Sequence, residues 1–350
     1  MRKVSQAIYD RIDNGVYAVQ SDQWWQPESA WYQMTVSFNP ARVGYAKRKL
    51  IEELKFDPKA TSALEVGCGG GFLTEEIARM GFATTGIDPS ERSIRVAADH
   101  ARQSGLDILY LTGAGESLPF EDRSFGAVFC CDVLEHVRDL PKVISEISRV
   151  LKPGGAFYYD TLNRTWASLL GAIKIGQVWK RWAFFPPNLH DWRMFIKPGE
   201  MKSLLRQNGL EWKDHRGTMP DVPIPRLLGY LRKRAKGEWT YGELAGRVRM
   251  IESRITAVMY MGYAVKKDPS GADADPKKLE RRDGRCPENR QELPALCDVQ
   301  DRLSGERRLR FGDGKTLCQF LSRRQNGPLC SHRREDHSHH RKMRRDRRQL

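Results

Sequence analysis

The residues best suited to chemistry fall in two stretches of the chain. The first is the glycine-rich run Gly67–Gly71, which follows a predicted buried strand at residues 63–66, and an isolated acid, Asp88, comes one predicted helix and one strand later. Glycine lets the backbone turn tightly and approach a ligand with no Cβ in the way. A carboxylate at the end of the second strand is placed to accept hydrogen bonds from ribose hydroxyls. The pair predicts a nucleoside-binding site, although Asp88 could instead cap the helix that follows Ser90.

The second stretch is Cys131–His136, which follows another apolar run and holds Asp132, Glu135 and His136. Histidine exchanges a proton near neutral pH, so His136 is a candidate general base. His190 and Asp191 precede a predicted helix and could line the substrate side of the same site, although an aspartate in that position could also cap a turn.

Alternating strands and helices must position these residues. Strands are expected at 63–66, 83–87, 108–111, 127–130, 156–160 and 256–265, and helices at 43–54, 72–80, 140–151 and 197–208. This alternation is typical of an α/β fold with a mostly parallel sheet. Because the carboxyl ends of parallel strands meet at one edge, both stretches should face one crevice.

Five motifs then stand in a fixed order: Val66–Gly71, Gly86–Asp88, Glu116–Phe120, Asp132–Val137 and Leu151–Gly155. This series resembles the class I S-adenosylmethionine-dependent methyltransferases. The resemblance implies a Rossmann-like sheet of seven mostly parallel strands with helices on both faces. The glycine pattern is E-x-G-x-G-x-G rather than the dinucleotide pattern G-x-G-x-x-G, and its earlier third glycine suits a nucleoside without a pyrophosphate.

Segments outside the cofactor motifs narrow the resemblance. They are Trp24-Trp25, Asn39–Arg42 with Tyr45, Thr161–Arg164 and His190–Pro198. These segments are similar to those of the ubiquinone-biosynthesis O-methyltransferases over about residues 20 to 265. Membership would imply methyl transfer from S-adenosylmethionine to a phenol or catechol oxygen of a polyprenylated quinone precursor. A phenol titrates near pH 10, so such an acceptor needs a base or a metal at pH 7.

The resemblance also assigns roles to residues. Arg42 would pair with the cofactor's carboxylate, since a guanidinium fork suits that group. The cofactor-binding set would be Arg42, Gly67, Gly69, Gly71, Asp88, Glu116 and Cys131, and the catalytic set would be His136, Glu135 and Asp132. A divalent metal such as Mg²⁺ or Zn²⁺ would be held by Asp132, Glu135 and His136, but Leu-Glu-His also occurs in class I methyltransferases without a metal. Ala114 stands where many members carry an acid for the adenine amino group.

The flanking segments suggest a cap and a lid. Residues 1–60 are rich in Trp and Tyr and are expected to form an N-terminal helical cap on a methyltransferase domain at 61–265. Trp24 and Trp25 could shelter the substrate or pin this cap to the sheet. An insertion is expected at about 165–255, where Trp166–Pro187 combines aromatic and basic residues. It could lie on a membrane surface, cover an apolar substrate, or pack as an ordinary helix.

Composition limits the remaining possibilities. The chain has 350 residues and a formal charge of +15, most of which falls in residues 266–350. That basic, low-complexity tail is expected to be disordered, as an unstructured extension or as residues translated out of frame. The folded domain is therefore not expected to bind nucleic acid, whereas a tail that binds RNA or metal stays an alternative. Seven scattered cysteines and the absence of a long apolar run fit a cytoplasmic protein.

Two further functions remain compatible with the same motifs. One is a small-molecule methyltransferase of another, natural-product pathway, with a water-soluble acceptor. The other is a protein that binds S-adenosylmethionine without turnover.

Overall fold

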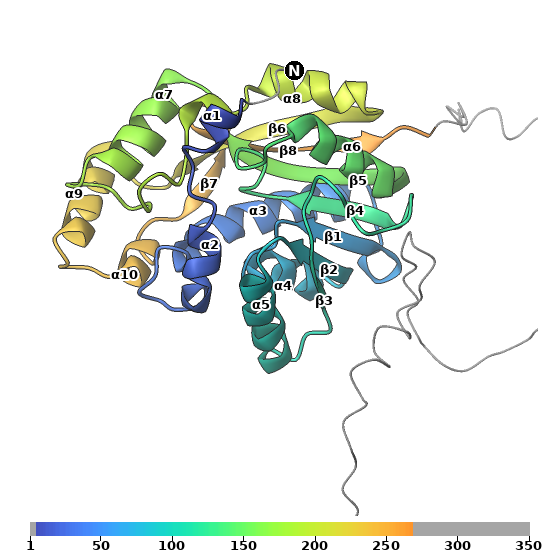
Figure 1. The fold of residues 1–350 in the computed structure, drawn as a ribbon, viewed down its shortest axis with the longest axis horizontal. Coiled ribbons are helices and arrows are strands. Elements are labelled where there is room, and N and C mark those ends of the chain that lie inside the picture. Colours follow the sequence, from blue (N-terminus) through green and yellow to red (C-terminus); the bar gives the residue numbers. More distant parts are fainter. Residues whose placement is uncertain (1–4, 269–350) are drawn as a thin grey trace, which may run out of the picture. The chain divides into compact units, whose positions relative to one another are not determined.

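A computed structural model describes residues 5–268 of the chain. Its centre is an eight-stranded sheet in the order β3-β2-β1-β4-β5-β8-β6-β7 (Figure 1). The strands are β1 Ser62–Val66, β2 Ala83–Asp88, β3 Leu109–Thr112, β4 Phe125–Cys130, β5 Leu151–Leu162, β6 Leu210–Pro220, β7 Met250–Ser253 and β8 Met259–Lys266. β1 to β5 pair in parallel, whereas β8 is antiparallel to β5 and β6, and β7 is antiparallel to β6.

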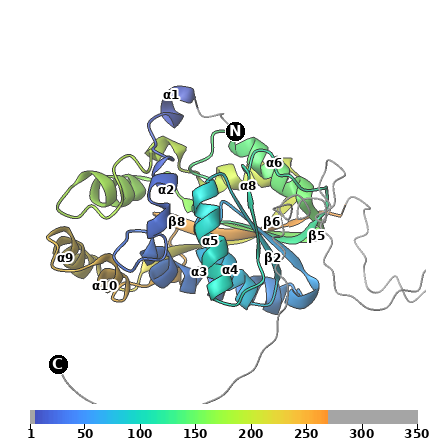
Figure 2. The ribbon, with the colours of Figure 1, turned by 60° about the horizontal axis from the view of Figure 1, so that its bottom comes forward.

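Helices cover both faces of this sheet (Figures 1 and 2). One face carries α3 Asn39–Ala46, α4 Phe72–Arg79 and α5 Glu91–Gln103, and the other carries α6 Leu140–Val150 and α8 Pro198–Gln207. The inner strands β1 and β4 are almost wholly buried because both of their faces are covered. The expected α/β class with a mostly parallel sheet is confirmed.

The expected count of seven strands is wrong, because β7 adds a short edge strand beside β6. Its residues Met250–Ser253 are half-exposed or exposed, so their sequence lacks the apolar alternation that marks a strand. β6 likewise carries charged residues along most of its length and was not expected. The helix expected at 140–151 ends at Val150, and Leu151 already pairs with Phe125 in the sheet.

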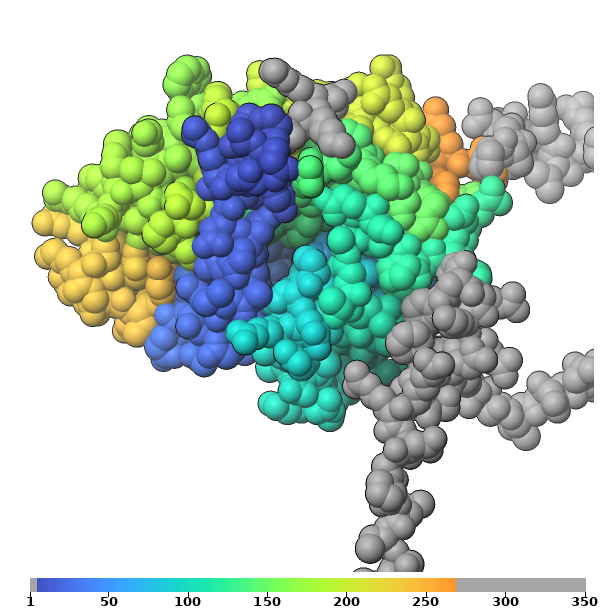
Figure 3. Space-filling view, viewed as in Figure 1, coloured from blue at the N-terminus to red at the C-terminus, as the bar shows by residue number. Residues whose placement is uncertain are grey.

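The N-terminal residues form short helical turns, and the first of them lie on the face seen in Figure 3, where they are dark blue. They are α1 Gln6–Tyr9, α2 Val16–Val19, η1 Ser21–Gln23, η2 Met34–Phe38 and, beyond α3, η3 Lys47–Glu53 and η4 Pro58–Ala60. This arrangement places the aromatic residues of the N-terminal segment against the carboxyl ends of the strands.

The residues between β5 and β8 add a second group of helices at one end of the sheet, on the left in Figure 1. These helices are α7 Trp166–Ser168, η5 Leu169–Val178, η6 Trp192–Met194, α9 Ile224–Ala235 and α10 Tyr241–Ala245. No helix among residues 5–268 is long and apolar enough to cross a membrane. The division at residues 60 and 265 stays a prediction, and the tail beyond residue 268 lies outside the described residues.

Candidate functional site

The glycine loop between β1 and α4 depends on backbone conformations that glycine favours. Gly67, Gly69 and Gly71 all have positive φ angles, of 76°, 51° and 88°. A Cβ on Gly67 would collide with the side chain of Val133 in the loop after β4. The backbone conformation of the loop thus explains why the sequence has glycine at these positions. On its other side the loop is open to the cavity, because Gly67 and Gly69 both line that cavity.

Asp88 ends β2 and lies beside that loop. Its Oδ2 accepts the N–H of Gly69 at 2.9 Å, and its Oδ1 accepts the N–H of Ser90 at 2.8 Å. Burial raises the pKa of Asp88, and these two backbone donors oppose that rise. The alternative role as helix cap is excluded, because Ser90 is the N-cap of α5 and accepts the N–H of Ser93. Asp88 lines the cavity and can receive a ligand's hydroxyls there.

Two tryptophans of the N-terminal segment contact the glycine loop. Trp24 packs against Gly69 and Gly70, and its Nε1 donates to Ser93 Oγ at 3.1 Å. Trp25 Nε1 donates to the carbonyl of Gly70 at 2.9 Å, and its ring stacks on His100 at 3.5 Å. Trp24 also lines the cavity. The pair therefore pins the cap in place, and Trp24 in addition forms part of the ligand wall.

Arg42 of α3 lies buried between two carboxylates. Its Nη2 donates to Asp132 Oδ2 and its Nε donates to Asp160 Oδ2. Asp160 Oδ1 in turn accepts the backbone N–H of Asp132 at 2.8 Å. The charges of the two aspartates outweigh burial and raise the pKa of Arg42, which stays protonated. These bonds use one edge of the guanidinium, so the remaining donors can reach an anion in the cavity that Arg42 lines.

His136 is held by two residues of the N-terminal segment. Asn14 Nδ2 donates to the backbone carbonyl of His136 at 3.1 Å, and Asn14 Oδ1 lies 3.2 Å from His136 Nδ1. Because that carbonyl can only accept, the amide oxygen must face the ring, and Nδ1 must carry the proton. Nε2 therefore keeps its lone pair and lies 3.4 Å from the hydroxyl of Tyr17.

Burial decides the protonation states around His136. It lowers the pKa of His136 to about 4, so the imidazole is neutral at pH 7. It raises the pKa of Tyr17 far above its usual range, with help from the charge of Asp132, so the phenol stays protonated and donates to Nε2. A neutral imidazole whose lone pair faces a phenol is the arrangement that a general base needs.

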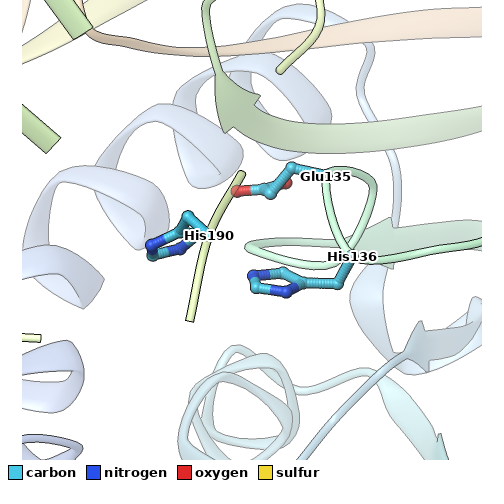
Figure 4. Close-up of side chains that lie close together, drawn as sticks. All are labelled: Glu135, His136 and His190. Atoms are coloured by element: carbon cyan, nitrogen blue, oxygen red, sulfur yellow. The ribbon is translucent and has the colours of Figure 1, made fainter. Parts of the chain in front are cut away.

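A second cluster joins Glu135, His136 and His190 (Figure 4). One potential ligand atom from each lies within 4.8 Å of the others. Glu135 Oε2 accepts from Thr161, but Glu135 Oε1 and His190 Nδ1 are buried without a hydrogen-bond partner among residues 5–268. Burial raises the pKa of Glu135 and lowers that of His190, so both are neutral near pH 7. Asp132 is not part of this cluster because it pairs with Arg42.

One cavity of about 910 Å³ connects these groups. Its lining includes the expected site residues Arg42, Gly67, Gly69, Asp88, Glu116, Cys131, Asp132 and His136. Ala114 lines it as well, and beyond His190 the wall becomes apolar towards η5 and α9. A volume near the upper end of ligand sites, which span roughly 300–1,000 Å³, leaves room for a cofactor and an acceptor together.

Residues 64–159 match the family described as "Methyltransferase domain". The chain is 38% identical to "Ubiquinone biosynthesis O-methyltransferase" of Caulobacter vibrioides over 204 residues, 56% of this chain and 79% of that protein. It is 32% identical to the protein of that name from Rhizobium etli over 223 residues, 62% and 89% of the two chains. The chain belongs to this O-methyltransferase family.

The O-methyltransferase uses S-adenosylmethionine as its methyl donor, as the resemblance implied. Among solved structures, it is similar to an S-adenosylmethionine-dependent methyltransferase from Aquifex aeolicus, with 14% identity, a TM-score of 0.44 and coverage of 73% of this chain and 98% of that one.

No sequence motif indicates a role for Asn14, Tyr17 or Asp160. Asn14 precedes α2 and Tyr17 lies within it, far from the motifs, so no spacing connects them with His136. Asp160 did carry a signal, because an acid inside an apolar strand must find a partner, and that partner is Arg42. Asp191 proves to cap η6 and to pair with Arg193.

Proposed function

We propose that this O-methyltransferase methylates a phenol or catechol oxygen of a polyprenylated quinone precursor. The observation that carries the proposal is the single cavity, which joins the glycine loop and Asp88, the base His136 and a long apolar wall. A head group with an ionisable hydroxyl and a hydrocarbon tail matches these two environments. The printed names of the relatives, which place them in ubiquinone biosynthesis, favour the same acceptor.

The residues around the glycine loop suit the cofactor. Gly67, Cys68, Gly69 and Asp88 border one part of the cavity, which the expected site residue Gly71 does not line, and Asp88 would hold the ribose hydroxyls. The buried, protonated Arg42 would hold the carboxylate of the methionine part. Glu116 and Cys131 line the same space, beside Ala114. The bound cofactor supplies a methyl group on a positively charged sulfur.

His136 would remove the acceptor's proton. Its pKa of about 4 lies far below that of a phenol, near 10, so the free phenolate would hardly form before methyl transfer. The proton must therefore move to Nε2 while the new bond to oxygen forms, when the hydroxyl becomes strongly acidic. Tyr17 presents a phenol to Nε2 in the structure and marks where an acceptor hydroxyl would lie.

The test is transfer of a labelled methyl group from S-adenosylmethionine to prenylated catechols. His136→Gln should lose most of the rate, roughly 10²–10⁴-fold, while S-adenosylmethionine affinity measured by calorimetry stays unchanged. Methylation of water-soluble catechols alone would favour a natural-product enzyme. Tight cofactor binding without methylation of any acceptor would favour a protein without turnover.

A divalent metal at this site is a separate proposal, in which His136 Nε2 would bind the metal instead of accepting the acceptor's proton. Carboxylate and imidazole are typical zinc ligands, and the unpartnered Glu135 Oε1 and His190 Nδ1 suit one. The structure favours His190, instead of the expected Asp132, as the third ligand beside His136. Zinc titration of the EDTA-treated protein should show binding that His190→Ala removes and Asp132→Asn retains. Full activity after EDTA and no zinc binding would reject the metal.

Peripheral membrane contact through Trp166–Pro187 is likewise proposed. Trp166 is 81% exposed and Trp179 is 42% exposed, and Leu170 and Val178 on the same segment are also exposed. Exposed aromatic and apolar side chains beside cations suit a bilayer interface. Changing both tryptophans to Gln should weaken sedimentation with anionic vesicles, whereas a control substitution of Trp212 on β6, Trp212→Gln, should not. A cytoplasmic location stays a prediction from the sequence.

A further inference from the structure

The apolar stripe of α9 is only partly packed against protein, because Leu227 and Leu231 join an apolar cluster while the stripe also borders the cavity. Ile224, Leu227, Leu228 and Leu231 recur at helical spacing, as in an amphipathic helix that covers a core. All four line the cavity, and of these α9 residues only Leu231 is fully buried. A stripe of this kind normally packs against protein, so its exposure to a cavity indicates a ligand that completes the packing.

The walls around α9 are apolar on every side. η5 contributes Ala172 and Ile175, while β6, α10 and β7 contribute Met219, Leu244 and Met250. Among the lining residues that η5, β6, α9, α10 and β7 provide, Thr218 alone has a polar side chain. Apart from the Thr218 hydroxyl, which has no hydrogen-bond partner among residues 5–268, the side chains of this wall offer no hydrogen bonds to a sugar, a base or an acid, and they favour hydrocarbon.

This part of the cavity has two ends. The inner end reaches His190, whose ring lies 5.0 Å from that of His136. At the outer end, three lining residues are also exposed: Met219 by 40%, Ile224 by 57% and Ile255 by 62%. A passage from the base to an apolar rim at the surface suits a long, flexible chain, because a compact substituent would need no opening at the far end.

We propose that the space between η5 and α9 is a channel for the isoprenoid tail of the acceptor, which enters and leaves past Met219, Ile224 and Ile255. This inference rests on the proposed function, and it adds where the tail lies and which helix covers it. Arg226, two residues after Ile224, and Arg232 and Lys233 further along α9 are exposed, and these cations would face an anionic bilayer from which such an acceptor is drawn. In Figure 1, α9 lies at the end of the molecule that also carries α7.

The experiment compares catechols with no tail, one isoprene unit and several units. Burial of each added unit in the channel should raise kcat/KM by roughly tenfold or more. Leu227→Trp and Leu228→Trp, which fill the channel, should lower kcat/KM for the long-tailed acceptor by roughly tenfold or more and leave the tail-free acceptor within about twofold. Ile251→Trp, on an exposed β7 position outside the lining, is the matched control.

A second readout separates this proposal from the proposed function. Binding of a long-tailed analogue whose hydroxyls are both already methylated is measured by calorimetry, which needs no turnover. Weaker binding in the two channel variants with unchanged S-adenosylmethionine affinity supports the channel, even if no catechol is methylated. Equal loss for tailed and tail-free ligands, or no effect of either variant, would overturn the channel while leaving catechol methylation standing.

Discussion

Asn14 Oδ1 lies 3.2 Å from His136 Nδ1, although 122 residues separate the two in the chain. The second arm of the same amide donates to the carbonyl of His136, which fixes its orientation. The N-terminal segment therefore does more than cover the site, because it determines which ring nitrogen of His136 carries the proton. Asn14 acts as a positioning residue for His136 and does not itself need to touch the acceptor.

Replacing Asn14 with Leu should lower kcat by roughly 10- to 100-fold, less than the loss of the base itself. Without the amide, the ring can protonate at Nε2 and turn its lone pair away from the acceptor. KM for S-adenosylmethionine should change little, because Asn14 lies on the His136 side of the cavity. Initial rates at saturating cofactor and acceptor measure the effect.

Asn14→Asp distinguishes positioning from simple packing. The carboxylate can still accept from Nδ1, and its charge stabilises the imidazolium, so the acidic limb of the rate profile should move to higher pH. A purely structural role would lower the rate without moving the profile. Wild-type kcat in Asn14→Leu would show that the amide does not orient the base.

Asp88→Asn should weaken S-adenosylmethionine binding by roughly 10- to 100-fold, since hydrogen bonds to a charged acceptor are worth about 1.5–3 kcal/mol. The variant amide has one oxygen in place of two, and Gly69 and Ser90 compete for it. Calorimetry measures the affinity, and Asp99→Asn, an exposed position on α5, is the control. Unchanged affinity would show that Asp88 does not bind the ribose of the cofactor.

Glu65 couples the stability of the glycine loop to pH. It is buried in β1, where desolvation raises its pKa to about 8 despite the hydrogen bond from Thr74. Between about pH 4.5 and 8 the folded protein thus binds one more proton than the unfolded chain, so the free energy of unfolding falls as pH rises. At pH 7 the free energy of unfolding is therefore about 3 kcal/mol lower than it would be if Glu65 had its ordinary pKa in the folded protein.

Glu65→Gln removes that proton uptake while keeping a side-chain oxygen for Thr74. The variant should therefore gain stability over the wild type as pH rises from 5.5 to 8.5, and the difference should disappear towards pH 4.5. Urea unfolding at several pH values measures it, with the exposed Glu91→Gln as control. A difference that does not change with pH would show that Glu65 is ionised in the folded protein.

Local pattern predicted the central sheet and the loop that it positions. Apolar runs, the three positive-φ glycines and the acid at the end of β2 are all read within short windows of sequence. β6 and β7 could not be predicted from local sequence, because they are the last two strands on one side of the sheet and carry polar residues. β6 pairs with β8, which follows it in the chain, and β7 in turn pairs with β6.

The environment of the base could not be predicted for a related reason. Sequence spacing brings Glu135 and His136 together, but Asn14, Tyr17 and His190 arrive through tertiary packing over long separations. Asp132 shows the opposite case, since the family resemblance implied a metal ligand, whereas its partner in the structure is Arg42 from α3. Helix α9 has a readable apolar stripe, yet only the fold shows that the stripe faces a cavity.

Gly67→Ala should destabilise the protein and weaken cofactor binding through two separable causes. A non-glycine residue at a φ of 76° costs about 1–2 kcal/mol, and the new Cβ collides with Val133. Relief of such overpacking is worth about 1–3 kcal/mol. Val133→Ala in the same chain should therefore recover part of the stability lost, but not the part that comes from the backbone.

A double-mutant cycle of Gly67→Ala and Val133→Ala measures this coupling by urea unfolding, with S-adenosylmethionine affinity as a second readout. We expect a favourable interaction energy of at least about 1 kcal/mol, because the two substitutions share one contact. Additive effects would mean that the loop moves away from Val133, so that contact between the new Cβ and Val133 does not contribute to the loss of stability. In that case the loss of cofactor affinity would have to come from the backbone conformation at position 67 alone.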